Sequence, residues 1–314
     1  MKTFSSSSPA SLLGLATLAL LGLAAAPAHA QTLSLNSGDN LTVSGAGTVG
    51  TQNGKAVSNT TSFYSTSGGN STVQTSGTST LTLANGGGIS GGKSGQGLLA
   101  IGSGAVSITG GSITGGQFGT AMAIQGSGPV TISGGTIQGT SGSFSNGLGN
   151  GTALAIYGSG AVTITGGTFA TGGNYFGGGT VLEAESSGPI TITGGIFTAG
   201  HSGYGGQGGY GLSVYGSTLN LFSFGGTPFL VDGVAMNNTT LNGSQFASNI
   251  GTISGILANG DVLNTLFQDH GKINLNIGSP PAAVPETSSV VSLGLLLMLG
   301  VGGIAFAARR KSAA

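Results

Sequence analysis

Short runs of alternating apolar and polar residues recur along the middle of the chain, and each run contains a pair of glycines. One run reads AVTITGGTF at 161–169, and close copies stand at 105–113, 129–137 and 189–197. Because the side chains of a strand point alternately to its two faces, the pattern predicts a strand, a tight corner and a second strand. We therefore expect one small β unit to be repeated along the chain.

The glycine pairs recur at intervals of 24 to 32 residues, and they stand at 110–111, 134–135, 166–167, 194–195 and 225–226. A period of about 20–50 residues is typical of a solenoid, in which each repeat stacks on the next. Glycine supplies the positive φ angles that a sharp corner requires. Loops of unequal length follow the second strands, and each loop leads to a third apolar run, at 120–125, 152–157, 180–185 and 211–215.

These features predict an all-β fold, namely a parallel β-helix (solenoid) with Gly-rich corners and three strands in each coil. Burying the inward side chains should contribute about 1.5–3 kcal/mol each. Alternation assigns the following apolar residues to the core: Val106, Ile108, Ile113, Val130, Ile132, Ile137, Leu154, Ile156, Val162, Ile164, Phe169, Ile190, Ile192 and Phe197.

The pattern also divides the chain into segments. Residues 31–101 hold degenerate copies that are expected to form early coils, and residues 102–224 hold the regular coils. Residues 225–278 are more polar and read as consecutive short strands, with Asn259-Gly260 suited to a two-residue hairpin turn. Because the open end of a solenoid must be covered, this last segment is expected to be a C-terminal cap.

The composition excludes several classes of protein. Only seven Lys or Arg and seven Asp or Glu occur among the 314 residues, whereas 66 residues are Gly and none is Cys. Binding of nucleic acid through its phosphates needs a basic patch, which the body of the chain lacks. The absence of cysteine excludes disulfides, thiol catalysis and thiolate metal sites. We expect no cofactor and no metal.

The N-terminus has the features of a targeting segment. Residues 1–30 combine Lys2, an apolar run at 11–26 and the small residues Ala28 and Ala30. This order is typical of a secretory signal peptide that is cleaved after its last small residue. An N-terminal membrane anchor is the alternative, although the apolar run is short for a span. The body of the protein is therefore expected to be exported.

The C-terminus contains a candidate membrane span. Residues 290–308 are almost entirely apolar, and Arg309, Arg310 and Lys311 follow them directly. A helix of this length measures about 29 Å, which is enough to cross the hydrocarbon core of a bilayer. A basic cluster favours the cytoplasmic side of a membrane. The sequence thus predicts a single C-terminal membrane-spanning helix.

A short motif, Val284-Pro285-Glu286, precedes that apolar run. The order of Pro-Glu motif, apolar helix and basic end over 279–314 resembles the PEP-CTERM sorting signal of Gram-negative bacteria. The resemblance implies processing by an exosortase-type enzyme and a final location at the cell envelope, at the cell surface or in the extracellular matrix. Thr287 stands where that family usually has a second proline, so a plain C-terminal membrane anchor is the alternative.

Glu183 and Glu185 form a close acidic pair on a predicted strand. Their spacing places both on the outer face with Cα atoms about 6.6 Å apart, and inverting glycosidases hold their carboxyls about 6.5–9.5 Å apart. One acid would need a raised pKa, which an exposed neutral strand does not obviously provide. Residues 31–285 also contain no Arg to assist such acids. A carbohydrate-active enzyme is therefore an alternative hypothesis only, and we assign no catalytic residue.

Two sets of outward residues are candidate ligand faces. Gln125, Tyr157, Glu185 and Tyr215 occupy the same outward position of successive third strands. Planar groups at strand spacing offer contact area to sugar rings, although tyrosine also simply suits an exposed strand. The first strands present a two-column set of hydroxyls, namely Ser107, Thr109, Thr131, Ser133, Thr163, Thr165, Thr191 and Thr193.

This two-column set is similar to the TxT faces of β-solenoid ice-binding proteins, some of which carry a comparable sorting tail. The resemblance implies ice binding as an alternative function. A simpler explanation is that Ser and Thr pair favourably across exposed strands, which requires no ligand.

Two further motifs lack the context that their chemistry requires. Residues 87–94 fit the phosphate-loop pattern G-x-x-x-x-G-K-[ST], but no helix is predicted after them. His201 stands alone in a Gly-rich loop and is expected to be solvated.

The sequence as a whole predicts an exported, non-enzymatic β-solenoid with a structural or adhesive role, associated with exopolysaccharide or a biofilm matrix.

Overall fold

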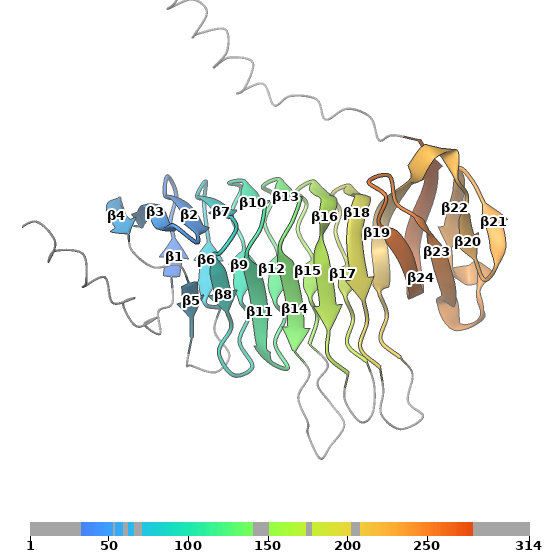
Figure 1. The fold of residues 1–314 in the computed structure, drawn as a ribbon, viewed down its shortest axis with the longest axis horizontal. Helices are drawn as coiled ribbons and strands as arrows, with labels where there is room; N and C mark the ends of the chain where they lie inside the picture. The colour runs from blue at the N-terminus through green and yellow to red at the C-terminus, as the bar shows by residue number, and fades with distance from the viewer. Residues whose placement is uncertain are drawn as a thin grey trace, which may run out of the picture. The chain divides into compact units, whose positions relative to one another are not determined.

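The computed structural model describes residues 33–52, 54–58, 62–65, 71–140, 151–173, 178–201 and 208–278. In these ranges the chain forms strands, turns and three short 3-10 helices, and its strands join one sheet in which parallel pairing dominates (Figure 1). The all-β prediction is confirmed for this part of the chain. The expected signal peptide (1–30) and sorting segment (279–314) lie outside the described residues. Within the described ranges, no helix is long and apolar enough to cross a membrane.

Three strands recur in each turn of the chain, and their counterparts in successive turns build three faces. Face 1 contains β2 (Asn40–Ser44), β7 (Thr80–Leu83), β10 (Val106–Ile108), β13 (Val130–Ile132), the first halves of β16 (Val162–Thr171) and β18 (Ile190–Thr198), and the second half of β19 (Leu212–Ser223). Face 2 contains β5 (Ser62–Tyr64), β8 (Gly88–Ser90), β11 (Ser112–Gln117), β14 (Thr136–Thr140) and the second halves of β16 and β18. Face 3 contains β1 (Leu33–Leu35), β6 (Val73–Thr75), β9 (Leu98–Ala100), β12 (Met122–Ile124), β15 (Leu154–Ile156), β17 (Leu182–Ala184) and the start of β19 (Leu212–Ser223).

On face 1 the apolar-polar-apolar triplets of successive coils pair in register from the first coil to the last. On face 1 one inward column passes through Leu41, Leu81, Val106, Val130, Val162, Ile190 and Leu219. The degenerate segment before residue 102 therefore supplies coils of the same kind as the regular repeats. It also contains β3 (Gly47–Gln52) and β4 (Lys55–Ser58), which add to β2 as an antiparallel hairpin.

The predicted inward residues form the core, and all of them are buried. The rings of Phe169 and Phe197 stack in parallel, with centroids 4.9 Å apart. Because equal side chains lie one strand spacing apart, alternation within one repeat is enough to define a continuous core. On face 2 the inward column passes through Phe63, Ile89, Ile113, Ile137, Phe169 and Phe197.

The Gly-Gly corners behave as expected. The second glycine of the pair takes a positive φ, for example +76° at Gly111 and +115° at Gly195. A Cβ at Gly111 would also lie 2.5 Å from the carbonyl oxygen of Gly87 in the preceding coil. In β16 and β18 the strand continues through the corner, whereas earlier coils have two separate strands there.

The C-terminal segment changes to antiparallel pairing. β24 pairs antiparallel with β22 and β23, and it also runs parallel to β19 over most of its length (Figure 1). This single strand therefore joins the last coil to the antiparallel strands. The elements of the segment are β20 (Phe229–Val231), β21 (Val234–Met236), β22 (Thr239–Asn242), β23 (Ile250–Ile256), β24 (Val262–Ile277) and the 3-10 helices Phe224–Gly226, Gly243–Gln245 and Ala247–Asn249.

The hairpin between β23 and β24 differs from the expected two-residue turn. The N–H of Leu257 donates to the carbonyl of Asp261 at 2.8 Å, which leaves a three-residue loop in which Gly260 has a φ of +96°. The longer loop is explained by its contacts. The N–H of Asp261 donates to Oδ1 of Asn259 at 2.9 Å, and Oδ2 of Asp261 accepts the N–H of Gly195 at 2.6 Å. The turn is therefore fastened to a Gly-Gly corner of the coils.

Candidate functional site

An outward column of neutral polar residues follows face 1 through the whole stack. We call it the polar column of face 1. None of its members is buried, and all lie in register in successive strands. Sequence analysis found only its middle part; the signal for the rest is the same apolar-polar-apolar triplet, read as LTV at 41–43 and INL at 273–275. The column consists of Thr42, Thr82, Ser107, Thr131, Thr163, Thr191, Asn220 and Asn274.

The C-terminal end of this column and its middle differ in whether their polar groups are hydrogen-bonded within the protein. Nδ2 of Asn274 donates to Oδ1 of Asn220 at 2.8 Å, and Nδ2 of Asn220 donates to the carbonyl of Ile190 at 3.2 Å. These amides are therefore occupied within the protein. By contrast, no group in the described part of the chain hydrogen-bonds the hydroxyls at positions 131, 163 and 191. These hydroxyls can donate to and accept from a ligand.

The second hydroxyl column of face 1 is interrupted, which differs from the expected two-column array. Ile164 pairs with Ile192, but Thr165 then pairs with Gly194, so Thr193 is the extra residue of a bulge. Its side chain is 8% exposed, and its hydroxyl points to the carbonyl of Ile164 at 3.4 Å. The outward positions Thr109, Ser133 and Thr165 remain exposed.

Face 3 brings the predicted tyrosine positions together in one column. Each is the next residue after a triplet that pairs in register with its neighbours, and the four are Gln125, Tyr157, Glu185 and Tyr215. His270 of β24 extends the column, and its ring stacks on that of Tyr215 with centroids 5.0 Å apart and planes 8° apart. The sequence analysis missed His270 because its partner lies 55 residues earlier in the chain. One ring face of Tyr215 is thus covered by the protein and is closed to a sugar.

Both tyrosines reach across to the neighbouring outward column of the next strand. The phenol of Tyr215 donates to Oε1 of Gln268 at 2.9 Å. The phenol of Tyr157 lies beside Glu183 and interacts with its carboxyl, and the hydroxyl of Thr152 donates to Oε2 of Glu183 at 3.5 Å. Each phenol therefore has its partner within face 3.

Burial and like charge perturb the titration of this group. Burial raises the pKa of the Glu183 carboxyl, the nearby Glu185 raises it further, and the hydroxyls of Thr152 and Tyr157 partly oppose this. Burial, together with the charges of Glu183 and Glu185, raises the pKa of Tyr157 to about 12. Glu183 can therefore hold a proton at a higher pH than an ordinary glutamate. A raised pKa is the property that one acid of the pair Glu183 and Glu185 would need for catalysis, and nothing in the sequence indicated it.

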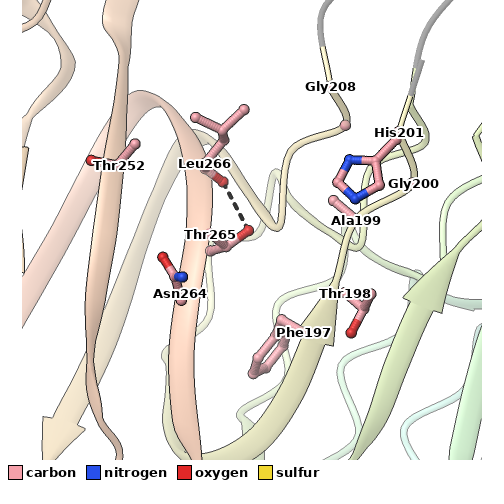
Figure 2. A pocket seen from close by; sticks show the side chains of 11 residues that line it. Phe197, Thr198, Ala199, Gly200, His201, Gly208, Thr252, Asn264, Thr265 and Leu266 are labelled. Carbon is pink, nitrogen blue, oxygen red and sulfur yellow. Dashed lines mark hydrogen bonds between the residues drawn. The ribbon is translucent and has the colours of Figure 1, made fainter. Parts of the chain in front are cut away.

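A cleft of about 390 Å³ lies between the end of β18 and the start of β24 (Figure 2). Thr198 and His201 line it on the side of the coils, and Thr252 and Asn264 line it on the side of β23 and β24. His201, which was expected to be a solitary solvated residue, is exposed but belongs to this cleft. Sequence analysis had no signal for the cleft, since its two walls are far apart in the chain.

The phosphate-loop pattern at 87–94 lacks the helix that a nucleotide site requires. Gly88–Ser90 form β8, Ser94 takes a φ of +59°, and the next element is β9. Among the described residues, no group of three or more His, Asp or Glu residues could hold a metal ion. The signal-cleavage and sorting residues lie outside the described residues; they are Ala28, Ala30, Val284, Pro285, Glu286, Arg309, Arg310 and Lys311.

No protein-family model matches this chain, and no curated protein and no solved structure is significantly similar to it.

Proposed function

We propose that this chain is an exported parallel β-helix protein that has a structural or adhesive role in an exopolysaccharide or biofilm matrix and catalyses no reaction. The observation that carries the proposal is the polar column of face 1, which continues in register from Thr42 to Asn274. The column is neutral and outward-facing, and its members repeat at the strand spacing of about 4.8 Å. A regular row of neutral hydroxyls suits a long neutral polymer that is itself rich in hydroxyls.

The physical basis of such binding is the addition of many weak contacts. A single exposed hydroxyl contributes little, because its hydrogen bond to a ligand replaces one to water. Several identical contacts on one rigid strand stack act together, since each later contact forms within an already bound chain. The buried core behind the column holds these hydroxyls in place before binding, which lowers the entropic cost.

The test is retention of the full-length chain on exopolysaccharide purified from the cells that produce it. We expect the triple variant Thr131→Val, Thr163→Val and Thr191→Val to bind about tenfold more weakly or worse, which corresponds to a loss of about 1.4 kcal/mol. Valine keeps the shape and the strand preference of threonine and removes only the hydroxyl. The matched control is Thr136→Val with Thr168→Val, which changes two paired outward residues of face 2. Equal binding by the triple variant and the wild type would contradict the proposal.

We further propose that residues 1–30 direct export and that residues 279–314 are a sorting tail processed by an exosortase-type enzyme. This places the mature protein at the surface or in the matrix of a Gram-negative bacterium, after a stage in which 290–308 span the membrane. Mass spectrometry of the mature protein provides the test. We expect a tail cut near Pro285 in the wild type and an uncut tail when Pro285 and Glu286 are both alanine. Recovery of Lys311 in the mature wild-type protein would indicate a plain anchor instead.

Ice binding is a second candidate, and the length of the polar column of face 1 favours it. The interruption at Thr193 counts against a flat two-column ice face at that end of the stack. Inhibition of ice recrystallisation by the wild type, lost in Thr163→Tyr and Thr191→Tyr, would support this candidate. Activity that is unchanged in these variants would eliminate it.

A carbohydrate-active enzyme is the third candidate, and the raised pKa of Glu183 favours it. A general acid must hold its proton near the working pH, and the Glu183 carboxyl is shifted in that direction. Turnover of the matrix polysaccharide by the wild type, abolished in Glu183→Gln with Glu185→Gln, would establish catalysis. We expect no turnover by either protein.

A further inference from the structure

The parallel pairing of face 2 ends at β18, and this leaves one strand edge without a partner strand. Thr168 and Phe169 of β16 pair with Ile196 and Phe197 of β18, and no described strand pairs with the opposite edge of this part of β18. Parallel pairing directs the backbone groups of alternate residues to opposite neighbours. The N–H of Thr168 donates to the carbonyl of Gly135 in the preceding coil. Ile196 pairs with Thr168, so its backbone groups also point toward the preceding coil. The N–H and carbonyl of the next residue, Phe197, therefore point away from that coil and into the cleft.

The start of β24 lies opposite this edge, and hydrogen bonds to β18 and to the residue before β19 fix its two ends. At one end the N–H of Gly195 donates to Oδ2 of Asp261 at 2.6 Å. At the other end the N–H of Gly211 donates to the carbonyl of Leu266 at 2.9 Å. Between these two hydrogen bonds the strands form no ladder, and the cleft occupies the gap. Because β24 pairs with β19 from Phe267 onward, the free edge beside the cleft is short and suits a small molecule better than an added strand.

The polar groups that line the cleft are neutral and of both kinds, donors and acceptors. The hydroxyl of Thr252 donates to Oδ1 of Asp232 at 2.9 Å, so it offers its lone pairs to a ligand. The amide of Asn264 can donate and accept, and the imidazole of His201 adds two ring nitrogens. No Lys, Arg, Asp or Glu is among the lining residues in the described part of the chain. A charged ligand would therefore leave its charge unpaired, whereas hydroxyl groups would find partners.

The cleft also has an apolar wall. Phe197 is the last ring of the inward column of face 2, and the side chain of Leu266 lies toward Gly208 at the other end of the cleft (Figure 2). A volume of about 390 Å³ lies within the range of small-molecule sites. A sugar ring combines an apolar C–H surface with a hydroxyl edge, and these two features match the wall and the polar groups.

We propose that this cleft is a binding site for a neutral saccharide. The saccharide would lie between the end of β18 and the start of β24, with an apolar C–H face against Leu266 and its hydroxyls bonded to Thr252, Asn264 and the free backbone edge of β18. The site shares no residue with the polar column of face 1. It therefore goes beyond the proposed matrix contact and does not depend on it.

The experiment measures binding of the full-length chain to maltotriose, cellotriose and mannotriose by calorimetry, with trigalacturonic acid as an anionic probe. We expect saturable binding of at least one neutral trisaccharide, and binding of trigalacturonic acid about tenfold weaker or worse. Gly208→Leu should abolish binding by filling the cleft, since a Cβ at Gly208 meets only Cδ1 of Leu266, at 3.8 Å. Asn264→Leu should weaken binding about tenfold by removing the amide.

Thr136→Val serves as the matched control, because it removes an outward hydroxyl of face 2 and leaves the cleft and the polar column of face 1 intact. Thermal unfolding of each variant shows whether it is folded, and Gly208→Leu and Asn264→Leu test the same site by different means. Absence of binding by all neutral probes, preference for the anionic probe, or wild-type affinity in a folded Gly208→Leu would each overturn the inference. Loss of matrix retention in the triple face 1 variant with intact trisaccharide binding would separate this site from the proposed function.

Discussion

Asp269 ends an inward column of face 3 that holds Ala184 and Val214 in the two preceding coils. Its side chain is fully buried, with 0% exposure; Oδ1 accepts the N–H of Gly271 at 2.8 Å, and Oδ2 has no partner in the described structure. Burial raises the pKa of Asp269, and this outweighs the lowering by the Gly271 hydrogen bond and by His270. A carboxyl in this position is better accommodated in its neutral form.

This residue predicts a pH dependence of stability. A group whose folded-state pKa is raised stabilises the fold below its unfolded pKa of about 3.9, and that contribution is lost as pH rises through the folded pKa. Between pH 4 and 7 we expect the wild type to lose on the order of 1 kcal/mol more stability than Asp269→Asn, whose amide does not titrate. Urea unfolding of both proteins across this range measures the difference, and parallel pH profiles would contradict it.

Glu183 and Tyr157 illustrate a contact that spans neighbouring strands. The two residues lie 26 positions apart, in adjacent strands of face 3. Their interaction joins one outward column to the next, and the carboxyl of Glu183 is partly buried. Sequence analysis identified both residues but treated them as members of separate features.

At the scale of elements, the corner glycines show how closely successive coils approach each other. Gly111 and Gly38 both have left-handed φ angles, +76° and +86°. A Cβ at Gly38 meets no atom within 4 Å, whereas at Gly111 it would lie 2.5 Å from a backbone oxygen of the preceding coil. Alanine at Gly38 should therefore suffer only from the backbone angle, and alanine at Gly111 from the clash as well.

We expect Gly38→Ala to lower the free energy of unfolding by about 1–2 kcal/mol, the usual cost of a left-handed residue other than glycine. Gly111→Ala should lower it by at least about 2 kcal/mol more, because backbone must shift in two coils. Urea denaturation of the full-length chain measures both values. Equal destabilisation by the two variants would show that the corner has room for a methyl group.

Among the strands, those of face 1 were the most predictable from sequence. Triplets such as VTI at 130–132 and ITI at 190–192 alternate strictly between apolar and polar residues, and the structure pairs them in register. The bulge at Thr193 was not predictable, because its triplet reads like the others. It occurs where the C-terminal turn attaches, and the N–H of Asn259 donates there to the carbonyl of Thr193 at 2.8 Å.

At the scale of the whole molecule, the scarcity of charge makes a prediction about binding. The polar column of face 1 contains no ionisable side chain, so its contacts with a polysaccharide should not depend on ion pairing. We expect the dissociation constant from the matrix polymer to change less than about twofold between about 50 and 500 mM NaCl. Polylysine on the same polymer is the control for electrostatic binding. A steep loss of affinity with salt would show that charged residues elsewhere make the contact.

The sequence by itself determined the all-β class, the inward columns and the positive-φ corners of this protein. These features follow from the alternation of residues within single repeats, where side-chain direction is a local property of the strand. Only the tertiary structure decided the full length of the polar column of face 1, the bulge at Thr193, the stack of Tyr215 on His270 and the cleft beside β18. Each of these depends on which strands become neighbours and in what register, and residues far apart in the chain meet only after the coils have stacked.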